Sequence, residues 1–542
     1  MPQILSLDNP GLFPAREAIP EQYCPKFPIH QRDYLLNGEL KSWAGEVKEV
    51  FSPVQVRTEN GVDPLLLGSY PRFGEAEAMA ALKAAAAAYD QGRGAWPTST
   101  VECRIKSLEK FLGLMKARRC EVVNLLMWEI GKNLKDSEKE FDRTVVYIED
   151  TIGEMKNLDR ASSRLEIKEG VIGQIRRAPL GVVLSMGPFN YPLNETFTTL
   201  IPALLMGNTA VFKPPKFGAL LYGPLLEAFA RAFPPGVVNT VYGDGSVIIK
   251  PMMESGLINV LAFIGTSRVA DKIKSQHPKL HRMKSVLGLE AKNPAVILPD
   301  ADLEPAVNEC LLGTLSFNGQ RCTALKILFV QEKILGEFLS RFSSAVDALQ
   351  VGLPWDNAGI TPLPEPGKPE FLAEMIRDAV EKGAKVVNPG GGKIIGNYLT
   401  PAVLSPVNAS MRIYHEEQFG PVVPVVPFSD LGEAVDYIID SDYGQQASVF
   451  GRNSQAIAEL VDPLVNQVCR VNLNSQCQRG PDAFPFTARK DSAEGTLSVS
   501  DALRVFSIRT LVAAKQNPVN QAILEEILRE RKSNFLNTDF IF

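Results

Sequence analysis

The residue in this sequence best suited to covalent chemistry is Cys322. It lies in a polar turn, Phe-Asn-Gly-Gln-Arg-Cys-Thr at 317–323, between an apolar, helix-like run at 307–315 and a strand-like run at 326–330. A thiolate attacks a carbonyl carbon readily once its pKa is lowered, and we expect the neighbouring Arg321 to help lower it. The alternative is an ordinary buried cysteine, which behaves as a small hydrophobic residue.

Asn190 supplies an amide at the end of a predicted strand, within Pro-Phe-Asn-Tyr-Pro at 188–192. The second proline of this motif stands near the start of the helix that follows. An amide donor fixed at a strand end is well suited to stabilise the oxyanion that forms when a thiolate adds to a carbonyl. Capping of the helix by Asn190 is the alternative.

Alternating strands and helices must position these groups. Such alternation between 180 and 274 predicts a parallel, doubly wound sheet. Its strands are expected at 182–186, 209–212, 237–241 and 260–264, and its helices at 193–205 and 219–233. A second alternating set begins at 294–298 and runs past 468–471, so we expect two α/β lobes that face each other, with Cys322 early in the second.

The remaining segments are predicted to add helices, an arm and strands for assembly. They comprise an N-terminal arm with a few strands (1–70), long helices (75–89 and within 101–158), two strands able to pair with a neighbouring subunit (164–177 and 507–513), and an amphipathic tail helix that either docks on a partner or folds back (522–532).

Two lysines follow the second strand of the first set, in Phe-Lys-Pro-Pro-Lys at 212–216. The residue at that place in a doubly wound sheet reads the adenosine ribose. An acidic group selects a free 2′-hydroxyl, whereas Lys213 and Lys216 suit a 2′-phosphate, so the electrostatics favour NADP over NAD. Solvated surface lysines are the alternative. Gly245 and Thr266, in the loops after the next two strands, permit close backbone approach or a phosphate contact.

Bulk properties exclude several classes of function. The chain has 542 residues and a formal net charge of −5 without long basic runs, so nothing favours binding to nucleic acid. No apolar stretch approaches the roughly 20 residues of a membrane span, and no membrane partner is expected. Seven cysteines without CxxC pairs indicate free thiols in a reducing compartment, which predicts a cytoplasmic location. Four scattered histidines offer neither a metal site nor a His-centred triad.

Five motifs, in order and spacing, resemble the signatures of the aldehyde dehydrogenase superfamily. They stand at 188–192, 212–214, 263–265, 318–322 and 416–421. The resemblance implies an α/β fold with two doubly wound lobes, a Rossmann-like cofactor lobe and a catalytic lobe, plus a small β oligomerisation extension. The expected domains are an arm with the dinucleotide-binding domain (1–286, with 164–178 in the extension), a catalytic domain (287–490), and a return segment with an oligomerisation strand and tail (491–542). The resemblance also implies that the chain assembles as a homo-dimer or homo-tetramer.

Within the superfamily, the closest resemblance is to the non-phosphorylating, NADP-dependent glyceraldehyde-3-phosphate dehydrogenases. Arg143, Tyr191, Arg321 and Arg479 resemble that group's phosphate pocket. A phosphate dianion in a cleft of an acidic protein needs forked, permanently charged donors, which three arginines and a tyrosyl hydroxyl supply. Taken singly, each arginine is equally explained as a surface ion pair.

The resemblance implies a role for each candidate. Cys322 would add to glyceraldehyde 3-phosphate, and Asn190 and the Cys322 backbone amide would hold the oxyanion. Hydride would pass to NADP⁺, leaving a thioester that is hydrolysed to 3-phosphoglycerate without an acyl phosphate. Glu417 would bind the nicotinamide ribose, with Phe419 packed beside it. The adenosine and pyrophosphate would be contacted by Lys213, Lys216, Gly245 and Thr266.

One position departs from the superfamily pattern. Members normally carry Glu-Leu-Gly-Gly-Lys before the cysteine, and that glutamate activates the hydrolytic water, whereas this chain has Gly-Leu-Glu-Ala-Lys at 288–292. In an extended segment Glu290 lies on the same side as Gly288, so we favour Glu290 as the base. Two alternatives stay open: a dehydrogenase that passes the acyl group to coenzyme A, and a nucleotide-binding member that has lost turnover.

Overall fold

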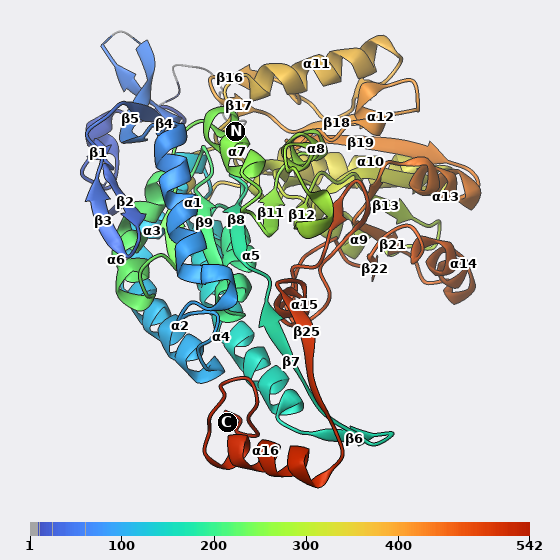
Figure 1. Cartoon of the computed structure of the whole chain (residues 1–542). Helices are drawn as coiled ribbons and strands as arrows, with labels where there is room; N and C mark the ends of the chain where they lie inside the picture. Colours follow the sequence, from blue (N-terminus) through green and yellow to red (C-terminus); the bar gives the residue numbers. More distant parts are fainter. Residues whose placement is uncertain (1–8, 10, 24, 60, 542) are drawn as a thin grey trace.

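The computed structural model describes residues 9, 11–23, 25–59 and 61–541. Two α/β bodies lie side by side, each built on its own sheet, and a narrow arm extends away from them (Figure 1). The body coloured blue to green comes mainly from the first half of the chain, and the body coloured yellow to orange from the second. The predicted two α/β lobes with a small β extension are confirmed.

The first sheet has six strands in the order β10-β9-β8-β11-β12-β24. Its strands are β8 (Val182–Met186), β9 (Thr209–Lys213), β10 (Val238–Thr240), β11 (Val260–Ile264), β12 (Lys284–Gly288) and the antiparallel β24 (Ala493–Glu494). Every residue of β8 is buried, as expected for a parallel strand covered on both faces. The strand order reverses between β8 and β11, and in such sheets ligands bind outside the carboxyl ends of the strands at this point.

Helices cover this sheet largely where the sequence predicts them. They are α1 (Glu75–Tyr89), α2 (Val101–Lys116), α3 (Arg119–Ile130), α4 (Leu134–Ser162), α5 (Asn194–Leu205), α6 (Gly223–Ala232), α7 (Gly245–Glu254) and α8 (Ser267–Ser275). The long helices predicted within 101–158 are three, α2, α3 and α4. Gly131 ends α3 in the left-handed conformation (φ 69°), where any Cβ would stand 2.4 Å from the carbonyl oxygen of Pro362.

The second sheet has seven strands in the order β15-β18-β19-β14-β13-β21-β22. Its strands are β13 (Asn293–Ile297), β14 (Leu325–Gln331), β15 (Lys385–Val386), β18 (Ala402–Ser405), β19 (Val422–Phe428), β21 (Gln446–Phe450) and β22 (Arg470–Leu473). Its helices are α9 (Leu303–Leu315), α10 (Glu332–Asp347), α11 (Lys368–Glu381), α12 (Arg412–His415), α13 (Leu431–Asp440) and α14 (Ser454–Leu464). All its strands run parallel except β15, which confirms the second predicted α/β set.

The two sheets meet at opposite ends of their strands. The loops that follow β8, β9 and β11 contribute to one cavity, and so do the segments that precede β14 and β19 in the second sheet. Cys322 stands three residues before β14, and Phe419 three residues before β19. The carboxyl ends of the first sheet therefore face the amino ends of the second, and residues far apart in sequence share the space between them.

The arm is a three-stranded antiparallel sheet. It contains β6 (Glu166–Lys168), β7 (Val171–Pro179) and β25 (Ser507–Lys515), and β7 and β25 pair along nine residues each. Helix α15 (Val499–Val505) precedes β25, and α16 (Pro518–Arg529) follows it at the foot of the arm (Figure 1). The tail then folds back, because the Asn537 carbonyl accepts hydrogen bonds from Gln174 Nε2 (2.6 Å) and Arg176 Nη1 (3.2 Å).

Shorter elements complete the described chain. They are β1 (Ile29–His30), β2 (Asp33–Leu36), β3 (Glu39–Ser42), β4 (Val47–Thr58), β5 (Gly61–Pro71), β16 (Ile394–Ile395), β17 (Tyr398–Leu399), β20 (Tyr443–Gly444) and β23 (Arg489–Lys490). The strands β1 to β5 form the predicted N-terminal arm. Positions 1–8, 10, 24 and 60 lie outside the described residues. Within the described ranges, no helix is long and apolar enough to cross a membrane. The domain boundaries at 286 and 490 stay predictions.

Candidate active site

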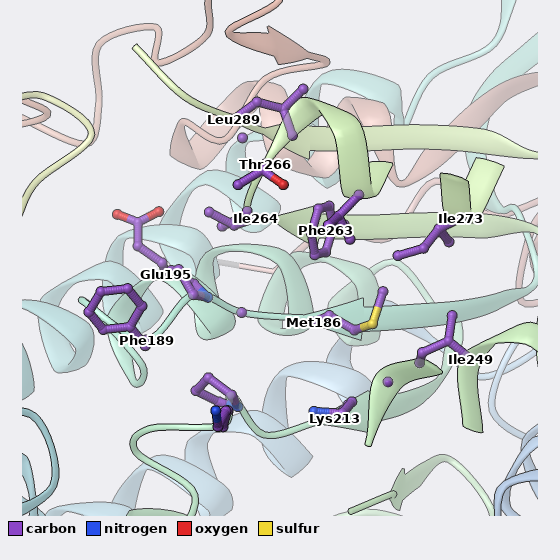
Figure 2. A pocket seen from close by; sticks show the side chains of 18 of the residues that line it. Met186, Phe189, Glu195, Lys213, Ile249, Phe263, Ile264, Thr266, Ile273 and Leu289 are labelled. Atoms are coloured by element: carbon purple, nitrogen blue, oxygen red, sulfur yellow. The ribbon is translucent and has the colours of Figure 1, made fainter. Parts of the chain in front are cut away.

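A cavity of about 930 Å³ opens between the two sheets. Figure 2 shows Glu195 beside Phe189 at one end, and Ile249 and Ile273 toward the other. Most of the predicted site residues line it. They are Asn190, Lys213, Lys216, Gly245, Thr266, Glu290, Cys322, Glu417 and Phe419. The structure therefore brings the predicted nucleophile, the predicted amide donor and the predicted cofactor-binding residues together around one cavity.

The loop that carries Cys322 is held in an uncommon backbone conformation. Phe317 (φ 48°), Asn318 (φ 56°) and Gly319 (φ 70°) are consecutive left-handed residues. A Cβ at position 319 would stand 2.7 Å from the Thr314 carbonyl oxygen, so only glycine fits. Asn318 Oδ1 accepts a hydrogen bond from the Thr361 backbone amide (2.9 Å), which ties the loop to a distant segment. Such conformations persist only when their surroundings fix them, as here.

The thiol of Cys322 is partly exposed to the cavity, yet its pKa is raised above the ordinary value. Burial is the largest cause, and the negative charge of Glu195 adds to it. The charges of Lys326 and Arg479 and a hydrogen bond from Gln445 oppose the rise. The expectation that Arg321 lowers this pKa is wrong, because the cations acting on the thiol are other residues.

Arg321 points away from the thiol toward the end of α9. Its Nη2 donates to the carbonyl oxygens of Leu312 (3.0 Å) and Gly313 (2.9 Å) and to Gln476 Oε1 (3.2 Å). Carbonyl groups at a helix carboxyl end attract cations, which explains why the guanidinium turns this way.

Asn190 is buried and fixed from two sides. Its carbonyl oxygen accepts a hydrogen bond from Lys132 Nζ (2.7 Å), and its Nδ2 donates to the Gln320 carbonyl (2.8 Å). A side-chain amide has two N–H groups, so one remains for an oxyanion on Cys322. Helix capping by Asn190 is not observed, because Glu140 Oε1 accepts from the backbone amides of Leu193 (3.0 Å) and Asn194 (3.2 Å) at the start of α5.

The lysines after β9 differ in environment. Burial and the charge of Lys48 lower the pKa of Lys213 to about 8, although Asp244 opposes the shift. Lys216 is exposed, with its Nζ 5.0 Å from the centre of the Phe217 ring. Lys250 and Lys272 also line the cavity and were not predicted. A dianion at this end of the cavity would therefore meet several ammonium groups.

Glu417 and Phe419 lie where the second sheet borders the cavity. Glu417 forms an ion pair with Lys326, and its Oε1 accepts from the Ala291 backbone amide (3.2 Å). Phe419 packs edge-on against Phe189 with ring centres 5.9 Å apart. The carboxylate and the ring thus stand side by side, as a role at the nicotinamide ribose requires.

Glu290 lines the cavity but is engaged elsewhere. Its Oε2 accepts a hydrogen bond from the Ser267 backbone amide (2.7 Å) at the start of α8, where the helix dipole favours a carboxylate. Gly288 also lines the cavity, and a Cβ there would make only ordinary contacts, the nearest at 3.4 Å with Ile264. The absence of a carboxylate at 288 is therefore not imposed by lack of space.

The predicted substrate-binding residues are not among the residues that line this cavity. Arg143 and Arg479 both bind Asp482 (2.8 and 3.2 Å), and Arg479 is also paired with Glu195. Burial raises the pKa of Tyr191, while the charges of Arg321 and Arg143 oppose the rise. The three arginines therefore occupy one neighbourhood, but two of them are neutralised by carboxylates and the third is bound to backbone carbonyls.

Known proteins resemble this chain in sequence over most of its length. Residues 52–511 match the sequence model of the aldehyde dehydrogenase family. This chain belongs to the aldehyde dehydrogenase family. NADP-dependent glyceraldehyde-3-phosphate dehydrogenase of Streptococcus equinus is 34% identical over 492 residues, covering 89% of this aldehyde dehydrogenase and 97% of that protein. 3-Sulfolactaldehyde dehydrogenase of Priestia aryabhattai is 30% identical over 399 residues, covering 72% and 82%.

Solved structures agree with the family assignment. The crystal structure of NADP-dependent glyceraldehyde-3-phosphate dehydrogenase from Bacillus halodurans C-125, complexed with NADP, is 32% identical to this aldehyde dehydrogenase. It matches with a TM-score of 0.82 and covers 90% of this chain and all of that one. The predicted family, the enzyme class of oxidoreductase and the fold are confirmed.

Several site residues escaped sequence reasoning. They are Lys132, Glu140, Glu195, Lys326 and Asp482. One signal was available, because Glu195 is the only charged residue in the helical run 194–205. Glu140 and Lys326 stand in ordinary helix and strand sequence, Lys132 and Asp482 stand in loops, and only their partners in space reveal them.

Proposed function

We propose that this enzyme oxidises glyceraldehyde 3-phosphate to 3-phosphoglycerate with NADP⁺. The observation that carries the proposal is one cavity lined by Cys322, Asn190 and Lys213 together. The names of the relatives from Streptococcus equinus and Bacillus halodurans support the same substrate and cofactor. Arg143, Arg321 and Arg479 lie in the neighbourhood of Tyr191 and are the permanent cations that support a phosphate, although carboxylates and backbone carbonyls hold them in this structure.

The chain's own groups divide the chemistry between them. The Cys322 thiolate adds to the aldehyde carbon, and the free N–H of Asn190 and the Cys322 backbone amide stabilise the oxyanion. NADP⁺, when bound in the cavity, would supply the hydride acceptor. Glu417 and Phe419 hold the nicotinamide end, and a thioester on Cys322 remains to be hydrolysed. The donor set fits this cofactor because four lysines and the thiol line one cavity of about 930 Å³, and ammonium groups suit the 2′-phosphate.

The experiment that tests the proposal compares substrates in phosphate-free buffer. With NADP⁺ and no coenzyme A, kcat/KM for glyceraldehyde 3-phosphate should exceed that for glyceraldehyde by about 100-fold or more, because two charge-assisted contacts contribute roughly 1.5–3 kcal/mol each. NADPH absorbance and chromatographic detection of 3-phosphoglycerate give the readout. Equal rates with both aldehydes would remove the phosphate from the assignment.

A second candidate is transfer of the acyl group to coenzyme A. The observation in its favour is that Gly288 carries no carboxylate and Glu290 is bound at the start of α8. Turnover that depends strictly on coenzyme A, with a thioester product, would select this function over hydrolysis.

Cofactor choice should depend on Lys213. Lys213→Ala should raise the KM for NADP⁺ about 10- to 100-fold and leave that for NAD⁺ nearly unchanged, because only NADP⁺ carries the 2′-phosphate. The pKa of Lys213 is lowered to about 8, so the charge is present below that pH and lost above it, and affinity for NADP⁺ should fall as pH rises past 8. The exposed Lys83 on α1 serves as a matched control. An equal loss for both cofactors would contradict the assignment.

Assembly and location complete the proposal. The arm exposes Ile167, Ile508 and Leu511, each more than half exposed, on strands that belong to its sheet. We place a homo-oligomer contact on this arm, where β25 is an edge strand able to pair with a second copy. A cytoplasmic location fits the six free cysteines of the described chain.

A further inference from the structure

Glu195 is a carboxylate at the reacting end of the cavity that none of the steps above uses. It stands on the first turn of α5, five residues after Asn190, and lines the same cavity as Cys322. It is 7% exposed, and Figure 2 shows its carboxylate pointing away from Lys213. Its negative charge is one of the causes that raise the pKa of Cys322, whereas Glu290 is not.

The two carboxylate oxygens of Glu195 are not equivalent. Oε2 forms the ion pair with Arg479, which is itself held by the Leu497 carbonyl (3.0 Å) and Asp482 (3.2 Å). Among the described residues Oε1 has no hydrogen-bond partner. The carboxylate is thus fixed at one oxygen and free to accept from a water molecule at the other.

We propose that Glu195 is the general base that activates water to hydrolyse the thioester on Cys322, in place of Glu290. This inference rests on the proposed function, because only a hydrolytic enzyme needs such a base. Glu290 is held by the Ser267 amide at the start of α8, whereas Glu195 lines the cavity together with Asn190 and Cys322. A base must lie within one hydrogen bond of the water it activates, and Oε1 of Glu195 is positioned for that role.

The water oxygen bonds to the carbonyl carbon of the thioester while Glu195 takes one of its protons. The carbon–sulfur bond then breaks, and its electron pair leaves on Sγ of Cys322. Glu195 returns the proton to the thiolate, and the acid product loses its remaining proton to solvent. No oxidant or further reactant is required, because the oxidation is complete before water attacks.

Rapid-mixing kinetics of Glu195→Gln test the proposal. Formation of the thioester does not need the base, so a burst of about one NADPH per subunit should survive, while steady-state turnover falls about 10²- to 10³-fold. Mass spectrometry of the intact protein should then show the acyl adduct on Cys322. The amide keeps the shape of the side chain and a hydrogen bond to Arg479. The exposed Glu109→Gln on α2 is the matched control and should retain parental kinetics.

A second variant separates chemistry from folding. Gly288 lines the same cavity with room for a Cβ, so Glu195→Gln combined with Gly288→Glu should recover at least tenfold of the lost turnover. Glu290→Gln tests the rival base and should retain most of the turnover. Loss of turnover in Glu290→Gln with little change in Glu195→Gln would overturn the proposal, and so would loss of the burst in Glu195→Gln.

The same measurements distinguish failure of this inference from failure of the proposed function. If the parent protein gives no burst with glyceraldehyde 3-phosphate, the substrate assignment fails, and the variants are compared on an aldehyde that does give one. If the parent turns over only with coenzyme A, hydrolysis is not its reaction and both proposals fall. If the parent hydrolyses its thioester and Glu195→Gln matches it within about threefold, only the base assignment fails.

Discussion

Replacing Cys322 with serine should lower kcat/KM by about 10⁴-fold or more, because the aldehyde is attacked by sulfur and a serine hydroxyl does not replace a thiolate. The nucleophile is an anion, and an alcohol ionises far less readily than a thiol. Burial and Glu195 already raise the pKa of the Cys322 thiol, so the site has no surplus ability to stabilise an oxyanion on a serine side chain. NADPH formation at saturating aldehyde measures the loss, and it should not be recovered by more cofactor.

The pH dependence of thiol reactivity follows from the same pKa. Because that pKa is raised, most of the thiol is protonated at neutral pH, and the rate of alkylation by iodoacetamide should climb about tenfold per pH unit while the thiol stays mainly protonated. The exposed Cys103 is the control, since Cys103→Ser should leave activity unchanged. A pH-independent alkylation rate at Cys322, or an active Cys322→Ser enzyme, would contradict the assignment.

Replacing Lys132 with methionine should lower the free energy of unfolding by about 3–5 kcal/mol, the usual result of breaking a fully buried ion pair. Lys132 and Glu140 are paired with no exposed side-chain surface on either residue. Without the ammonium group, Glu140 would keep only its contacts to the backbone amides at the start of α5. Denaturant unfolding followed by fluorescence measures the change.

The Lys132 variant should also lose activity in the protein that remains folded. The ammonium group donates to the Asn190 carbonyl and lies 3.6 Å from the centre of the Tyr191 ring, so it fixes the loop that presents the oxyanion donor. A matched control is Lys106→Met, which breaks an exposed pair with Glu102 and should change stability by less than about 1 kcal/mol. A similar decrease in the free energy of unfolding for the two variants would show that burial of the ion pair does not determine the destabilisation.

Much of the fold was predictable because its signals are local. The apolar run that forms β8 matches the predicted strand at both ends, as does the helix α1, and Cys322 stands in the predicted turn before a strand. Glycine and proline punctuation and short apolar runs depend only on neighbouring residues. The motifs around Asn190 and Cys322 are equally local, so residue type and order were enough to identify the reacting groups and the family.

Charge partners were not predictable in this way. Glu195 and Arg479 are 284 positions apart, and Arg143 and Asp482 are 339 apart. Their pairing exists only in the folded chain, where the segment after β22 contacts α4 and α5. Sequence reasoning consequently counted three free arginines where the structure shows two bound to carboxylates and one bound to carbonyls, and it expected Arg321 to act on a thiol that other cations reach.

The sequence by itself determined the order of strands and helices and the family, and it predicted a nucleophile, an amide at a strand end and two lysines that the structure brings to one cavity. Each of these depends on residue type and on spacing within a few turns of chain. The tertiary structure alone decided which carboxylate lies near the thiol, which cations are neutralised, and how deeply the thiol is buried. Those properties depend on distance and desolvation, and both are set only when remote segments pack together.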